Sequence, residues 1–146
     1  MTYIPAEIRR LVISRSGECC EYCRISREDH VLPFEIDHIT SQKHGGPSTA
    51  ENLCLSCWDC NNAKGSDIAG ADPVTKKATL LFHPRQQRWN DHFQLKEAVI
   101  VPLTPEGRVT LFVLQLNHPD RLIEREMLIA LSRYPSERFP ESSTSD

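Results

Sequence analysis

A carboxylate and an imidazole are neighbours in the chain at Asp37 and His38. The carboxylate is a hard oxygen ligand that suits Mg²⁺ or a similar ion. The imidazole can take a proton from water near neutral pH. Together these are the groups that a metal-assisted hydrolase needs, although an Asp-His pair alone is also compatible with a structural or solvated histidine.

Six cysteines fall in two short clusters, and none lies beyond Cys60. Two C-x2-C pairs have the spacing of a tetrahedral structural zinc site, which makes a metal site a better interpretation than a disulfide scaffold or buried free thiols. The predicted zinc ligands are Cys20, Cys23, Cys57 and Cys60. Cys19 could replace Cys20, and Cys54 could replace Cys60, but we interpret Cys19 as a spectator and Cys54 as a core thiol.

The elements between and around the cysteines form a recognisable order. Residues 4–15 carry apolar side chains at helical spacing. Residues 31–39 and 52–56 are predicted strands, joined by a glycine-containing loop over residues 42–49. Residues 59–67 are a predicted helix. The order strand, loop, strand, helix is a ββα unit that would place Asp37 and His38 at the end of its first strand.

Residues 9–67 resemble the HNH endonuclease family. The matching residues are Gly17, Cys20-x2-Cys23, Glu35-Ile36-Asp37-His38-Ile39, Gly45-Gly46, Asn52-Leu53, Cys57-x2-Cys60-Asn61 and Lys64-Gly65. The resemblance implies an α+β fold with a small ββα-metal finger, an N-terminal helix and a structural zinc. It also implies hydrolysis of DNA phosphodiester bonds with a single catalytic divalent ion.

The resemblance assigns a role to each polar residue. His38 matches the general base, Asp37 the first ligand of the catalytic ion and Asn61 the second. Many members have histidine at the position of Asn61, so this sequence is an H-N-N variant in which Mg²⁺ or Mn²⁺ is the expected ion. Asn52 matches the middle asparagine, which braces the loop and the base. Lys64 could face a phosphate or be an ordinary solvated lysine.

A change of composition after residue 68 suggests a boundary. We expect an HNH nuclease domain over residues 1–68, an extension packed on it over 69–134 and a disordered tail over 135–146. Apolar runs at 97–103 and 108–116 flank a turn and predict a β-hairpin in the extension.

A helix is predicted over residues 119–133 of the same extension. Its expected buried stripe consists of Leu122, Ile123, Met127, Leu128 and Leu131.

The segment 80–93 is dense in arginine and aromatic residues. Arg85 and Arg88 are candidates for contact with the DNA backbone. Trp89 and Phe93 lie four residues apart, so we favour one packed helix face for them over base stacking.

The formal net charge of the 146 residues is −3, which does not indicate tight stand-alone DNA binding. No apolar run approaches the ~20 residues needed to span a bilayer. Residues 1–7 lack a basic region followed by an apolar one. We therefore expect a cytoplasmic protein with no membrane partner, which acts on double-stranded DNA with a possible protein partner or as a homodimer.

Two other functions compete with the nuclease. One is a catalytically decayed zinc-binding module that holds nucleic acid or a protein. The other is a redox protein using its C-x2-C pairs, but the sequence lacks the βαβ context that such a motif needs. The joint presence of Asp37, His38, Asn52 and Asn61 favours the enzyme.

Overall fold

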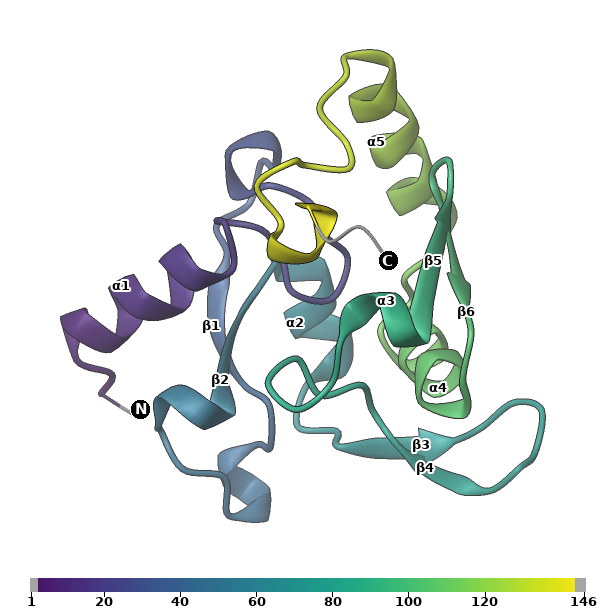
Figure 1. Cartoon of the computed structure of the whole chain (residues 1–146). Coiled ribbons are helices and arrows are strands. Elements are labelled where there is room, and N and C mark those ends of the chain that lie inside the picture. Colours follow the sequence, from purple (N-terminus) through teal and green to yellow (C-terminus); the bar gives the residue numbers. More distant parts are fainter. Residues whose placement is uncertain (1–2, 144–146) are drawn as a thin grey trace.

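The computed structural model of the chain describes residues 3–143 and shows a mixed α and β fold (Figure 1). Its antiparallel strand pairs are β1 (Glu35–His38) with β2 (Leu53–Ser56), β3 (Ala69–Ala71) with β4 (Ala78–Leu80), and β5 (Phe93–Lys96) with β6 (Val99–Pro102). The α-helices are α1 (Ala6–Arg15), α2 (Trp58–Lys64), α3 (Trp89–His92), α4 (Pro105–Val113) and α5 (Pro119–Ala130). Short 3-10 helices are η1 (Arg27–Asp29), η2 (Gln42–His44), η3 (Ala50–Asn52) and η4 (Pro140–Ser143). Among the described residues, no helix is long and apolar enough to span a membrane.

The strands β1 and β2 and the helix α2 form the predicted ββα unit. The register pairs Asp37 with Cys54 and His38 with Leu53. Helix α1 lies beside this unit (Figure 1) and buries Val12 in a cluster with Leu53. Because α2 follows β2 after a single residue, the polar residues of β1 and those of α2 are held close together.

A second, larger core joins the two halves of the chain. Trp89 is 1% exposed, and its indole nitrogen donates a hydrogen bond to the Tyr22 carbonyl oxygen at 2.8 Å. The rings of Trp89 and Phe93 are buried and 5.0 Å apart, so they pack together as expected, but they do not share a helix face because Phe93 begins the strand β5. The later segments therefore add buried apolar side chains to the core of the ββα unit, which is too small to bury a large core by itself.

For the hairpin predicted over residues 97–116, the first strand is confirmed as β6, but the second strand is wrong. The hairpin is β5–β6, which comes earlier, and residues 105–113 form helix α4. The Thr104 hydroxyl accepts a hydrogen bond from Gly107 N at 3.0 Å, and Pro105 opens the first turn. An apolar run of this length does not by itself distinguish a buried strand from a buried helix.

Helix α5 was predicted correctly, but its buried face was not. Ile123, Met127 and Leu131 are 55%, 64% and 67% exposed. Arg121 and Arg125 are buried beside Leu128 instead. The guanidinium of Arg125 donates to the carbonyl oxygens of Ala98 at 2.7 Å and Leu116 at 2.8 Å. Hydrogen bonds to these backbone carbonyls offset the cost of burying the charge.

The disorder expected over residues 135–146 is also wrong for residues 135–143. The remaining residues, 144–146, lie outside the described part of the chain. Phe139 is 4% exposed, and its ring lies beneath the Arg24 guanidinium at 4.6 Å. The Glu141 carboxylate accepts hydrogen bonds from the backbone nitrogens of Trp89 at 2.8 Å and Asn90 at 3.0 Å. The segment after α5 therefore returns across the molecule (Figure 1) and packs on its core.

Replacing Phe139 by alanine should destabilise the protein by about 3 kcal/mol, because it removes a buried aromatic ring from the core. The matched control is Phe112→Ala, since Phe112 is 60% exposed and its loss should change stability by about 0.5 kcal/mol or less. Denaturant unfolding measures both. Equal stability of the Phe139 variant and the wild type would show that the tail does not pack on the core.

Candidate active site and cysteine cluster

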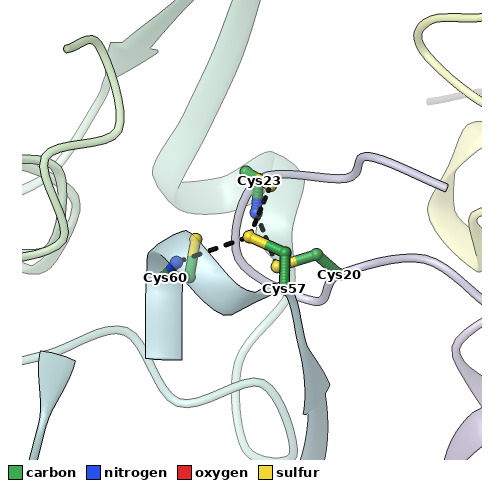
Figure 2. A group of neighbouring side chains, drawn as sticks. All are labelled: Cys20, Cys23, Cys57 and Cys60. Carbon is green, nitrogen blue, oxygen red and sulfur yellow. Dashed lines mark hydrogen bonds between the residues drawn. The ribbon is translucent and has the colours of Figure 1, made fainter. Parts of the chain in front are cut away.

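Four buried cysteines converge where the N-terminal knuckle meets the start of α2 (Figure 2). The Sγ atoms of Cys20, Cys23, Cys57 and Cys60 all lie within 4.8 Å of one another. Cys57 caps α2, and its Sγ accepts a hydrogen bond from Cys60 N at 3.4 Å. In the first pair, Cys20 Sγ accepts one from Cys23 N at 3.5 Å. Four thiols at this separation fit a tetrahedral zinc ion, so the cluster could hold zinc.

The two remaining cysteines are not part of this cluster. Cys19 donates a hydrogen bond to the Gly17 carbonyl oxygen at 3.4 Å. Cys54 is fully buried in β2, and its thiol contacts the Tyr22 hydroxyl at 3.5 Å. The interpretation of Cys19 as a spectator and Cys54 as a core thiol is consistent with these contacts.

A buried arginine from α5 contacts the cysteine cluster. Arg121 is 7% exposed, and its Nη2 lies 2.9 Å from Cys60 Sγ and 3.7 Å from Cys57 Sγ. Its Nη1 donates to the Leu114 carbonyl oxygen at 2.9 Å. Burial would lower the pKa of Arg121, but the thiol groups around it raise the pKa and the net shift is upward. Four thiolates and one Zn²⁺ carry a net charge of −2, which a guanidinium partly compensates.

Asp37 is 6% exposed and lies at the centre of a polar network. Its Oδ2 is 3.2 Å from Lys64 Nζ and accepts a hydrogen bond from the Tyr22 hydroxyl at 3.1 Å. Burial raises the pKa of the Asp37 carboxyl, and the Lys64 ammonium opposes this shift. Within residues 3–143, the hydrogen bonds and ion pairs of this carboxylate all use Oδ2.

Lys64 differs from both sequence-based interpretations. It is 1% exposed, and its ammonium also donates to the His38 carbonyl oxygen at 3.0 Å. The residue therefore does not point towards solvent, where it would meet a phosphate or water. It connects the last turn of α2 to Asp37 and His38 on β1.

His38 and Asn52 organise the loop that joins the two strands. The half-buried imidazole of His38 uses Nε2 to contact Ser48 Oγ at 2.9 Å. Asn52 Oδ1 accepts from Thr40 N at 2.9 Å, and its Nδ2 donates to the carbonyl oxygens of Thr40 at 2.9 Å and Pro47 at 2.8 Å. A Cβ on Gly46 would lie 1.7 Å from the Thr40 carbonyl oxygen, so this close approach requires glycine.

Asn61 lies half-buried on α2, one helical turn before Lys64. Within the described residues, Asn61 forms hydrogen bonds through its backbone only, so its amide oxygen is available as a ligand. Together with Asp37 Oδ1, it supplies the hard oxygen donors that Mg²⁺ or Mn²⁺ takes. The donor chemistry of Asp37 and Asn61 therefore fits a hard divalent ion.

The two arginines predicted to contact DNA differ in exposure. Arg85 is 20% exposed and forms an ion pair with Glu21, whose other oxygen accepts from Leu55 N at 2.9 Å. Arg85 is thus held against the strand β2, and the expectation that it binds DNA is not supported. Arg88 is 48% exposed, with Glu141 at 4.0 Å. It stays a prediction.

Sequence reasoning missed three residues that shape this region. Tyr22, Ser48 and Arg121 contact Asp37, His38 and the cysteines respectively. Only Tyr22 had a local signal, because it lies inside the first C-x2-C pair.

Comparison with known proteins identifies the ββα unit. A family model described as HNH endonuclease matches residues 20–67. These residues form an HNH domain. The HNH domain contains the cysteine cluster and the polar residues Asp37, His38, Asn52 and Asn61, for which the resemblance predicts catalytic roles.

A curated relative extends the similarity beyond the HNH domain. The Septu protein PtuB of Bacillus thuringiensis is 26% identical over 125 residues, which cover 84% of this chain and 46% of that protein. The chain therefore spans about half the length of this relative. No solved structure matches the chain.

Arg121→Met should lower the affinity of the cysteine cluster for zinc about tenfold, because it removes the cation that contacts two of the sulfurs. Competition with a chelator measures the affinity. The control is Arg10→Met, which removes an exposed arginine of α1 and should leave the affinity unchanged. Wild-type affinity in the Arg121 variant would show that the guanidinium does not stabilise the metal-bound form.

Proposed function

We propose that the protein is a metal-dependent HNH endonuclease that hydrolyses DNA phosphodiester bonds, with His38 as the general base. The observation that carries this proposal is the placement of His38 within the HNH domain. Its half-buried imidazole lies at the end of β1 and is oriented by the uncharged Ser48 hydroxyl at 2.9 Å. A hydroxyl partner fixes the orientation of the ring and places no charge beside it.

The chain's own residues have separate tasks in this reaction. His38 takes the proton from a water molecule in line with the scissile phosphate, which gives 5′-phosphate and 3′-hydroxyl products. Asn52 holds the backbone at Thr40 and Pro47, and so fixes the loop that follows the base. Lys64 connects Asp37 to the His38 carbonyl and keeps both residues in register with α2.

Asp37 Oδ1 and the Asn61 amide oxygen would hold the catalytic Mg²⁺ or Mn²⁺ ion. When bound, the ion supplies Lewis-acid stabilisation of the charge that develops on the phosphate and the leaving 3′-oxygen.

The proposed substrate is double-stranded DNA. The net charge of −3 favours weak, transient binding to DNA, because neutralisation of phosphates supplies most of the non-specific affinity. A protein partner or a second copy of the chain would supply the additional contacts.

The second candidate is a decayed HNH domain that binds nucleic acid or protein without cutting. The buried ion pair of Asp37 with Lys64 favours this alternative. The ammonium already balances the carboxylate charge that would attract a metal ion.

The nuclease is tested by plasmid nicking with purified protein in Mg²⁺, Mn²⁺ or EDTA. His38→Ala should lower the rate at least about 100-fold, because it removes the general base. The matched control, His44→Ala, changes an exposed histidine in the loop that follows β1 and should cut at the wild-type rate. Undiminished cutting by His38→Ala would remove His38 as the base. A folded, zinc-loaded wild-type protein that does not cut the plasmid would favour the decayed HNH domain.

A further inference from the structure

A second group of metal-ligating side chains lies outside the active site and the cysteine cluster. It combines His30, from the segment before β1, with Asp59 of α2 and Glu124 of α5. One ligand atom from each residue lies within 4.8 Å of the other two. His30 Nδ1 is 2.7 Å from Glu124 Oε2, and its Nε2 is 3.4 Å from Asp59 Oδ2.

The histidine at the centre of this group is deeply buried. Its side chain is 7% exposed, whereas Asp59 and Glu124 are 33% and 28% exposed. Within the described part of the chain, His30 Nε2 is a buried nitrogen without a hydrogen-bond partner. The ring is therefore fixed by Glu124 on one side and directs an incompletely satisfied nitrogen towards Asp59 on the other.

The three side chains line a groove of about 630 Å³ between α2 and α5. Apolar side chains of α5, including Ile123 and Met127, line the same groove. This partly buried group of two carboxylates and a neutral imidazole carries a charge of −2, and protonation of the imidazole leaves −1. A divalent cation bound to the neutral imidazole brings the group to zero, and so offsets the cost of holding these charges partly out of water.

We propose that His30, Asp59 and Glu124 form a second metal site, which binds a first-row divalent transition ion such as Mn²⁺, Co²⁺ or Zn²⁺. One imidazole nitrogen and two carboxylate oxygens suit these ions, whereas Mg²⁺ and Ca²⁺ prefer all-oxygen sites. The three residues supply three ligands, and the groove leaves the remaining positions accessible to water or to a ligand. This site is independent of the proposed cleavage reaction.

The site would connect three segments that are far apart in the sequence. Asp59 lies between Cys57 and Cys60 in α2, and Glu124 lies one turn after Arg121 in α5. An ion bound here would therefore link α5 to the HNH domain, next to the contact between Arg121 and the cysteine sulfurs.

The test is equilibrium dialysis of the full chain, already loaded with zinc at the cysteine cluster, against Mn²⁺ and Co²⁺. Glu124→Gln keeps the shape of the side chain, and Glu124→Ala deletes the ligand. Both should lose one bound ion per chain or bind it at least about tenfold more weakly. The control, Glu126→Gln, changes an exposed glutamate on the same helix and should bind as the wild type does.

Absorption spectra of the Co²⁺ forms show which site is filled. An ion held by nitrogen and oxygen lacks the thiolate-to-cobalt charge-transfer bands of a cysteine site, so the extra Co²⁺ in the wild type should lack these bands. The proposal is overturned if both Glu124 variants keep the wild-type number of ions and affinity, because the three residues then form only an ion-paired connection. It is also overturned if the extra Co²⁺ carries thiolate bands.

Discussion

The convergence of four cysteine sulfurs is the constraint on which the rest of the structure depends. It joins the knuckle at Cys20 and Cys23 to the first turn of α2, although both strands of the ββα unit lie between them in the sequence. The C-terminal segments then dock on the same point. The Tyr134 hydroxyl donates to the Cys23 carbonyl oxygen at 2.7 Å, and Arg121 contacts Cys60. Since structural zinc binding is coupled to folding, filling this cluster would also stabilise the segments packed around it.

The cysteine cluster also helps to position the candidate active-site residues. Cys57 caps α2, and the helix that it starts places Asn61 and Lys64 against β1. Lys64 then reaches both Asp37 and the backbone of His38. A change in the cluster would therefore move the candidate ion ligands through α2, even though no cysteine contacts them on the α2 face. A more direct connection runs through Tyr22, which lies between Cys20 and Cys23 and whose hydroxyl donates a hydrogen bond to the Asp37 carboxylate at 3.1 Å.

The sequence predicted the ββα unit because its signals are local. Strand alternation, paired glycines and C-x2-C spacing each act over a few residues, and the antiparallel pairing of β1 with β2 followed from them. The errors came from long-range contacts. Arg121 and Arg125 are buried on α5 because carbonyls and sulfurs distant in sequence accept their hydrogen bonds. Likewise, the core beneath Trp89 is completed by Phe139, 50 residues later in the chain.

Anomalous diffraction at the zinc absorption edge, from a crystal of the full chain, tests the central claim most directly. The account predicts a peak at the centre of the four sulfurs of Cys20, Cys23, Cys57 and Cys60, about 2.3 Å from each. The absence of a peak from zinc-supplemented protein would contradict it. So would an ion held by Cys54 in place of one of the four, because α2 would then be fixed in a different position relative to β1.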